Sequence, residues 1–93
     1  MLARVHVIVS GRVQGVAFRW YAQREAEDRG LTGWVRNRRN GRVEVCVEGE
    51  RSEVAEFAEW MRRGPMLARV DEVEETWAQA SGEFADFQVR STA

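Results

Sequence analysis

The feature that most constrains the fold of this chain is the way its hydrophobic period changes along the sequence. Val5, Val7 and Val9 recur at every second position, which is the period of a strand with one buried face. From Ala17 to Arg29 the apolar side chains recur at helical spacing instead, and Gly30 is a natural end for that helix. The expected buried face of the helix consists of Phe18, Tyr21, Ala22 and Ala26.

The next part of the chain has the pattern of a β-hairpin. We expect strands from Thr32 to Arg38 and from Arg42 to Glu48, because Asn40-Gly41 between them can adopt the positive φ angles of a two-residue turn. In the second strand, valines alternate with Glu44, Cys46 and Glu48. We expect the valines to face the core and the other three side chains to face water, as in a sheet covered on one face only.

A second helix is expected after the hairpin. Ser52 is a favourable N-cap, and Gly64-Pro65 is a strong helix stop. The buried stripe of this helix would consist of Val54, Phe57, Ala58 and Met61. Two further extended segments follow, near Val70 to Trp77 and Phe84 to Arg90, with Ser81-Gly82 between them.

The resulting order is β-α-β-β-α-β plus a short last strand. It predicts an α+β fold of the ferredoxin-like type, a sandwich in which a mainly antiparallel sheet carries two helices on one face. Right-handed crossovers give the first four strands the spatial order 4-1-3-2, and the pattern assigns no place to the last strand. We expect residues 1–93 to form a single domain, because 93 residues suit one core.

The composition excludes several classes of function. A net charge of -1 disfavours a dedicated nucleic-acid binder, which needs a basic face. All 14 basic residues are arginine, so a Walker-type phosphate loop and Schiff-base chemistry are excluded, because both use lysine. Cys46 is the only cysteine, which fits a reducing cytosol.

The same sequence bears on location and assembly. We find no secretory signal and no apolar stretch long enough to cross a bilayer, so we expect a cytoplasmic protein without a membrane partner. No long apolar stretch demands a partner chain either, and we expect a monomer.

The segment from Gly11 to Arg19 is suited to binding an anion. It joins the first strand to the first helix, so its amides include the unpaired N–H groups of the first helical turn, and the helix dipole favours a phosphate there. Gly15 lets the backbone curl closely around a ligand. Arg19 can add a bidentate guanidinium contact to two phosphate oxygens.

The expected topology adds a second polar residue to this segment. The first strand ends at the edge of the sheet where the loop lies, and the strand from Thr32 to Arg38 runs in the same direction. Asn37, near the end of that strand, is therefore expected at the same edge as Arg19.

Two stretches of sequence resemble the signatures of the acylphosphatase family. Gly11-Arg12-Val13-Gln14-Gly15-Val16-Ala17-Phe18-Arg19 resembles the signature G-x-V-Q-G-V-x-F-R. Gly33-Trp34-Val35-Arg36-Asn37, followed by Gly41-Arg42-Val43-Glu44, resembles the second signature, G-W-V-x-N-x-x-x-G-x-V-E. The resemblance extends over essentially the whole chain.

The resemblance implies a ferredoxin-like enzyme that hydrolyses the carboxyl–phosphate anhydride of small acyl phosphates to a carboxylate and phosphate, without a metal or cofactor. It implies that Arg19 binds the phosphoryl group and that Asn37 orients the attacking water. The remaining phosphate contacts would come from the backbone amides of Gln14, Gly15, Val16, Ala17 and Phe18.

Two other functions fit parts of the pattern. One is a non-catalytic ferredoxin-like module that binds a phosphorylated metabolite, which the presence of both Arg19 and Asn37 disfavours. The other is a carbamoyl-phosphate role, because similar modules begin larger carbamoyl-transferring maturation proteins. We expect no such role, because 93 residues leave no room for a further domain.

Residues outside the loop have simpler interpretations. We expect His6 on the surface and a solvated edge strand, not a metal site, around Glu72, Glu74 and Glu75. Acidic residues in the strand from Arg42 to Glu48 occupy positions where an RNA-binding sheet has aromatic residues. A basic cluster is expected at the solvated hairpin tip, where it could steer anionic substrates; it consists of Arg36, Arg38, Arg39 and Arg42.

Overall fold

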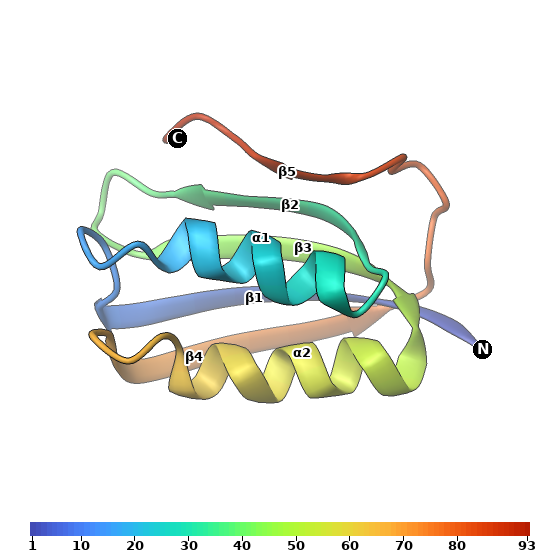
Figure 1. Ribbon diagram of the computed structural model, residues 1–93, viewed down its shortest axis with the longest axis horizontal. Coiled ribbons are helices and arrows are strands. Elements are labelled where there is room, and N and C mark those ends of the chain that lie inside the picture. The colour runs from blue at the N-terminus through green and yellow to red at the C-terminus, as the bar shows by residue number, and fades with distance from the viewer.

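The computed structural model describes residues 1–93 and contains five strands and two helices (Figure 1). In chain order the elements are β1 (Leu2–Arg12), α1 (Phe18–Asp28), β2 (Thr32–Asn37), β3 (Val43–Glu50), α2 (Arg51–Arg63), β4 (Arg69–Ala78) and β5 (Phe87–Val89). Every element expected from the sequence is present, and the expected order is confirmed. Neither helix is long and apolar enough to span a membrane.

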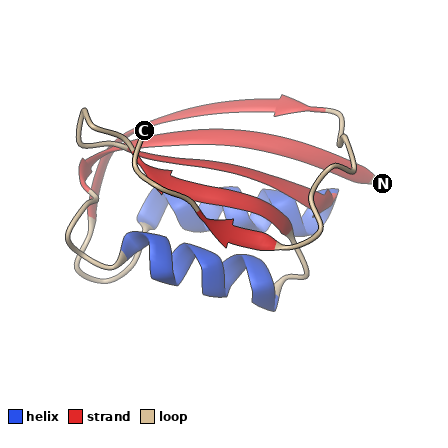
Figure 2. Cartoon of the chain, turned by 90° about the horizontal axis from the view of Figure 1, so that it is seen from above, coloured by secondary structure: helices blue, strands red, loops and turns tan.

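The strands form one mixed sheet in the order β4-β1-β3-β2-β5. The expected order of the first four strands is confirmed, and each neighbouring pair among them is antiparallel. The last strand, β5, pairs in parallel with β2, with Gly33 opposite Phe87 and Val35 opposite Val89. Both helices cover the same face of the sheet (Figure 2), as the ferredoxin-like prediction requires.

The core lies between the helices and the sheet. Val5, Val7 and Val9 of β1 are completely buried against the helices, as their alternation predicts. The predicted stripe of α2 is confirmed, since all four of its members are buried. The prediction for α1 is wrong at Tyr21, which is 45% exposed. Its ring lies edge-on against Trp20, with the ring centroids 4.8 Å apart, on the solvent side of the helix.

The start of α2 also differs from the prediction. The helix begins at Arg51 directly after β3, so Ser52 lies inside its first turn and Glu50 occupies the N-cap position without a side-chain cap. A backbone group far away in sequence partly replaces that cap, because the Arg51 N–H donates to the Met1 carbonyl at 2.8 Å. A local capping pattern could not indicate this contact with the chain terminus.

The turn between β2 and β3 is longer than the two residues predicted. Arg38 N–H donates to the Arg42 carbonyl at 2.8 Å, and Gly41 N–H donates to the Arg38 carbonyl at 3.1 Å. Three residues therefore form the loop, with Gly41 at a φ of 89° as its left-handed member. This is the next most common hairpin geometry and uses the same residue types.

The prediction that the far face of β3 is exposed to water is wrong. Glu44, Cys46 and Glu48 are at most 5% exposed. Glu48 accepts hydrogen bonds from the backbone N–H groups of Ser81 and Gly82, at 2.8 and 3.0 Å, so the connection between β4 and β5 covers this part of the sheet. Buried carboxylates need such partners, because an unpaired charge away from water is costly.

Candidate active site

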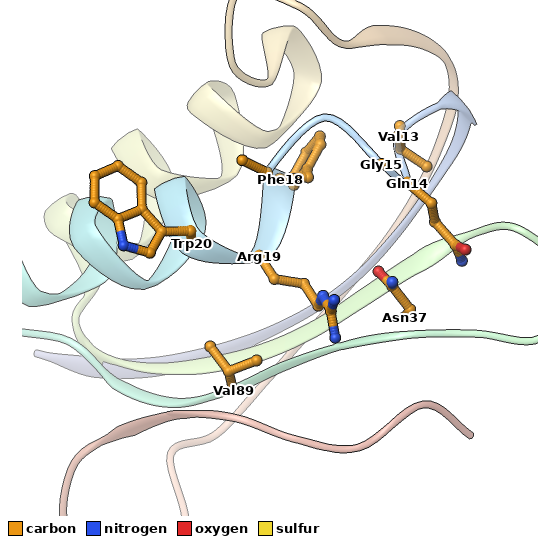
Figure 3. Close-up of a pocket in the computed structure, with 9 residues that line it drawn as sticks. Val13, Gln14, Gly15, Phe18, Arg19, Trp20, Asn37 and Val89 are labelled. Atoms are coloured by element: carbon orange, nitrogen blue, oxygen red, sulfur yellow. The ribbon is translucent and has the colours of Figure 1, made fainter.

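A hollow of about 310 Å³ lies where β1 ends and α1 begins (Figure 3). Its lining comes from the loop between these elements, the first turn of α1, the end of β2 and the last strand. The lining residues are Val13, Gln14, Gly15, Ala17, Phe18, Arg19, Trp20, Asn37 and Val89. Four separate segments therefore meet at one edge of the sheet.

The loop from Val13 to Ala17 is anchored in the core by two of its residues. Val13 and Val16 are buried in the core, whereas Gly15 and Ala17 are exposed. Gly15 has a φ of 73° and Ala17 a φ of 59°, and Ala17 is the only non-glycine residue of the chain with a positive φ. A left-handed conformation costs an alanine about 1–2 kcal/mol, so the buried neighbours hold the loop in a curl that its own residues do not favour.

This curl leaves backbone donors unused. The N–H groups of Gly15, Val16 and Ala17 donate to no acceptor in the protein. Ala17 is also the N-cap of α1 and makes no side-chain cap, so the free donors of the helix start lie next to those of the loop. The positive end of the helix dipole is directed at the same place. The loop therefore presents a concave set of donors suited to an anion.

Arg19 extends from the first turn of α1 into the hollow, and Figure 3 shows its guanidinium group directed towards Asn37. No carboxylate lies within ion-pairing distance of it, although most arginines of this chain pair with an acid or stack on an aromatic ring. An uncompensated guanidinium beside free N–H groups gives the hollow a positive potential.

Asn37 is the last residue of β2, and its side chain points into the hollow from the side opposite the loop (Figure 3). Its amide makes no hydrogen bond within the protein, and its backbone carbonyl accepts the Ala93 N–H at 3.1 Å. The structure thus brings Arg19 and Asn37 to the same edge of the sheet, as the topology predicts.

Gln14 has a role that the sequence did not indicate. Its side-chain Nε2 donates to the carbonyl of Arg38 at 2.7 Å and to the carbonyl of Arg42 at 2.9 Å. These bonds tie the loop to the hairpin that follows Asn37. The sequence pattern indicates only the backbone amide of Gln14 as a phosphate contact, because the carbonyls that accept from its side chain come close to it only in the folded chain.

A buried carboxylate fixes the same hairpin from the face of the sheet that carries no helix. Glu44 accepts hydrogen bonds from Arg36 Nε at 2.8 Å, from an Arg38 guanidinium nitrogen at 3.2 Å and from His6 Nε2 at 2.6 Å. Burial on its own would raise the pKa of Glu44, but the bonds from His6, Arg36 and Arg38 outweigh it and lower the pKa. His6 is half-exposed and serves as a partner of Glu44.

The predicted solvated arginine cluster is therefore wrong in part. Arg36 and Arg38 are half-buried partners of Glu44, and Arg42 pairs with Glu74 of β4 at 3.2 Å. Only Arg39 is exposed without such a partner. No group of three or more His, Cys, Asp or Glu side chains is arranged to hold a metal ion.

Known proteins share this architecture and much of this sequence. The family model described as Acylphosphatase matches residues 5–89. An acylphosphatase of Methylococcus capsulatus is 50% identical over 88 residues, which cover 95% of this chain and 96% of that protein.

Two solved structures extend the similarity to the fold. The crystal structure of acylphosphatase from Bacillus subtilis matches with a TM-score of 0.90 at 38% identity, covering 97% of this chain and 99% of that one. The structure of an acylphosphatase from Coxiella burnetii also has a TM-score of 0.90, at 40% identity, and covers 96% of this chain and 93% of that one.

Proposed function

Since the chain belongs to the acylphosphatase family and hydrolyses acyl phosphates, we propose that the hollow at the start of α1 is its active site. In this proposal, Arg19 and the backbone amides of Gln14 to Phe18 hold the phosphoryl group, and Asn37 orients the attacking water. The proposal rests on one observation: unpaired backbone N–H groups of the loop, the unpaired guanidinium of Arg19 and the free side-chain amide of Asn37 all meet at one hollow.

The first part of the mechanism is binding of the phosphoryl group. Its charge is spread over three equatorial oxygens during transfer, so a protein accelerates the reaction mainly by positioning and by electrostatic stabilisation. The N–H groups of Gly15, Val16 and Ala17 are already oriented and unpaired, so they need little rearrangement when the charge develops. Arg19 adds a planar pair of donors that matches two phosphate oxygens.

The second part is attack by water. An asparagine amide is no base, but its oxygen can accept a hydrogen bond from a water and hold that water in line with phosphorus. The water oxygen forms the new P–O bond while the bond to the acyl oxygen breaks, and the acyl group leaves as a carboxylate with the bonding electrons. One water proton passes to an oxygen of the phosphate. A carboxylate is a good leaving group, so the reaction requires no general acid.

Separate readouts for binding and turnover test these two roles. Arg19→Leu removes two charge-assisted hydrogen bonds, and we expect kcat/KM for acetyl phosphate to fall by about 10³-fold or more, with weakened binding of inorganic phosphate. Asn37→Ala removes only the water contact, and we expect kcat to fall by about 100-fold while the Kd of phosphate stays within about twofold. Arg51→Leu is the control, because Arg51 is an exposed arginine at the start of α2 and its backbone N–H bonds to Met1, at the far end of β1 from the loop.

Two results would contradict the assignment. An Asn37→Ala protein that retains full activity would refute the role of Asn37 in orienting water. An Arg19→Leu protein that binds phosphate as tightly as the wild type would refute the role of Arg19. Phosphate binding by the wild type without turnover of any acyl phosphate would favour a non-catalytic binding module.

We further propose that residues 1–93 act as a single-domain monomer in the cytoplasm. The edge strand β4 exposes Glu72 and Glu74, and charges on an edge oppose pairing with a second sheet. Cys46 has no second cysteine to pair with. Sedimentation equilibrium should give the 10.7 kDa mass of one chain, and a mass of twice that value would contradict the monomer.

A further inference from the structure

A second hollow, of about 470 Å³, adjoins the phosphate-binding loop and is lined by uncharged residues only. Its large exposed side chains are those of Tyr21, Met66 and Leu67, which are 45%, 97% and 71% exposed, and we refer to these three residues as the apolar shelf. Met66 and Leu67 lie in the connection between α2 and β4. Adjacent apolar side chains with this much exposure commonly mark a binding surface.

The two hollows are continuous at the loop. Gly15 and Ala17 line both of them. Gly15 carries no side chain, and no atom lies within 4 Å of the position that a Cβ would take there. Ala17 contributes only a methyl group. A molecule whose phosphoryl group is bound at the loop can therefore extend over Gly15 and Ala17 to the apolar shelf.

The sheet order places the shelf on the side opposite Asn37. The phosphate-binding loop follows β1, which lies between β4 and β3 in the sheet. Asn37 ends β2, beyond β3, whereas Met66 and Leu67 lead into β4. Figure 1 shows this arrangement, with the loop after β1 lying between the β2–β3 turn and the connection from α2 to β4.

This placement matters because the attacking and leaving oxygens of phosphoryl transfer are roughly in line through phosphorus. A water held by Asn37 approaches from the β2 side. The leaving carboxylate, together with its acyl group, must then lie on the β4 side, where the apolar shelf is.

We propose that the apolar shelf is the binding site for the acyl group, and that this enzyme prefers acyl phosphates with an apolar chain of several carbons over acetyl phosphate. The inference rests on the proposed function, since the phosphoryl group must be held at the loop. No ionised side chain lines the shelf, so a charged acyl group would gain no ion pair there. An extended apolar chain would remove the side chains of Met66 and Leu67 from water.

A series of acyl phosphates tests the proposal, with kcat/KM measured for acetyl, butyryl and hexanoyl phosphate. The shelf is open on one side, so we expect each added methylene to contribute about half the effect of complete burial, which is about a twofold gain in kcat/KM. Hexanoyl phosphate has four more methylenes than acetyl phosphate, which gives a ratio of about 16-fold. The gain should come mainly through KM, because the shelf contacts are the same before and during transfer.

The matched variants are M66S/L67S on the shelf and Leu2→Ser as the control. Leu2 is 67% exposed and lies at the far end of β1 from the loop. We expect M66S/L67S to reduce the hexanoyl-to-acetyl ratio to about twofold or less, and Leu2→Ser to keep the wild-type ratio. All three substitutions replace exposed side chains, so folding should be maintained.

The outcomes separate this proposal from the one on which it rests. A wild-type enzyme that hydrolyses acetyl phosphate but shows no dependence on chain length refutes the acyl site and leaves the active-site proposal standing. A ratio that M66S/L67S and Leu2→Ser change equally refutes the acyl site as well. A wild-type protein that hydrolyses none of the three compounds refutes both proposals.

Discussion

The side chain of Gln14 connects the phosphate-binding loop to the hairpin that carries Asn37, and replacing it by leucine should reduce both stability and turnover. Its Nε2 donates two hydrogen bonds, at 2.7 and 2.9 Å, to the carbonyls of Arg38 and Arg42. Leucine has a similar size but no donor, so the loop and the hairpin would lose their direct polar connection while the packing volume is largely kept.

The expected magnitudes follow from these two bonds. Each contributes about 0.5–1.5 kcal/mol net, so the free energy of unfolding should fall by about 2 kcal/mol. For a domain of this size that loss lowers Tm by about 8–16 °C. Asn37 would also be held less well relative to the loop, and a displacement of about 1 Å can reduce turnover by about 100-fold. We therefore expect kcat to fall by about 10- to 100-fold at a temperature where the variant is folded.

Gln23→Leu is the matched control for this prediction. Gln23 Nε2 donates to the Phe87 carbonyl at 3.2 Å and ties α1 to β5 without contacting the loop. Its loss should cost about 1 kcal/mol of stability and leave kcat within about twofold of the wild type. Urea unfolding and acetyl phosphate hydrolysis give the two readouts. If Gln14→Leu lost stability but retained the wild-type kcat, the tether would stabilise the fold without positioning Asn37, and our reasoning would be refuted.

Two further predictions concern stability. Burial would raise the pKa of Glu48, but bonds from Ser81, Gly82 and Arg4 outweigh it and lower the pKa from 4.5 to about 2. Because the pKa of Glu48 is lower in the folded protein than in the unfolded chain, its ionised form stabilises the fold at neutral pH, and this stabilisation is lost as the pH falls. Between pH 5 and pH 3 the free energy of unfolding of the wild type, measured in urea, should therefore fall by about 2 kcal/mol more than that of Glu48→Gln. Equal losses in the two proteins would contradict this prediction. Separately, Gly33→Ala places a Cβ 1.9 Å from the Cys46 carbonyl oxygen and should cost about 4 kcal/mol or more, whereas Gly15→Ala, where the space is open, should cost about 1–2 kcal/mol by the same measurement. Equal losses in the two alanine variants would show that the close contact is relieved by movement of the backbone.

The elements of this fold were predictable because each depends on neighbours in the sequence. The valines of β1 and the stripe of α2 mark the buried faces by their spacing alone, and the order of the elements then restricts the sheet to few arrangements. The start of α2 at Arg51 does not depend on neighbouring residues in this way, and the predicted N-cap at Ser52 is wrong. The first free donor of the helix is satisfied by Met1, which lies 50 positions away in the sequence.

The candidate site was predictable for a similar reason, but less completely. Arg19 and the loop are adjacent in sequence, and the topology adds Asn37. Val89 also lines the hollow, but it could not be anticipated because it belongs to β5, whose place beside β2 is set by contacts between distant segments. The side-chain tether of Gln14 depends on the loop and the hairpin being adjacent and has no counterpart in a sequence pattern.

The sequence by itself therefore determined which segments fold into strands and helices, which of their faces are buried, and that a loop suited to a phosphate precedes α1. Only the tertiary structure decided which charges are buried, because the hydrogen-bond partners that allow Glu44 and Glu48 to be buried include His6 and Ser81, which are distant in sequence. It also decided that Asn37 and the apolar shelf lie on opposite sides of the loop, since that arrangement follows from the order of strands in the sheet. The backbone period of a helix or strand determines which side chains share a face. Which distant segments pack together determines which polar groups are buried and where each residue lies around the site.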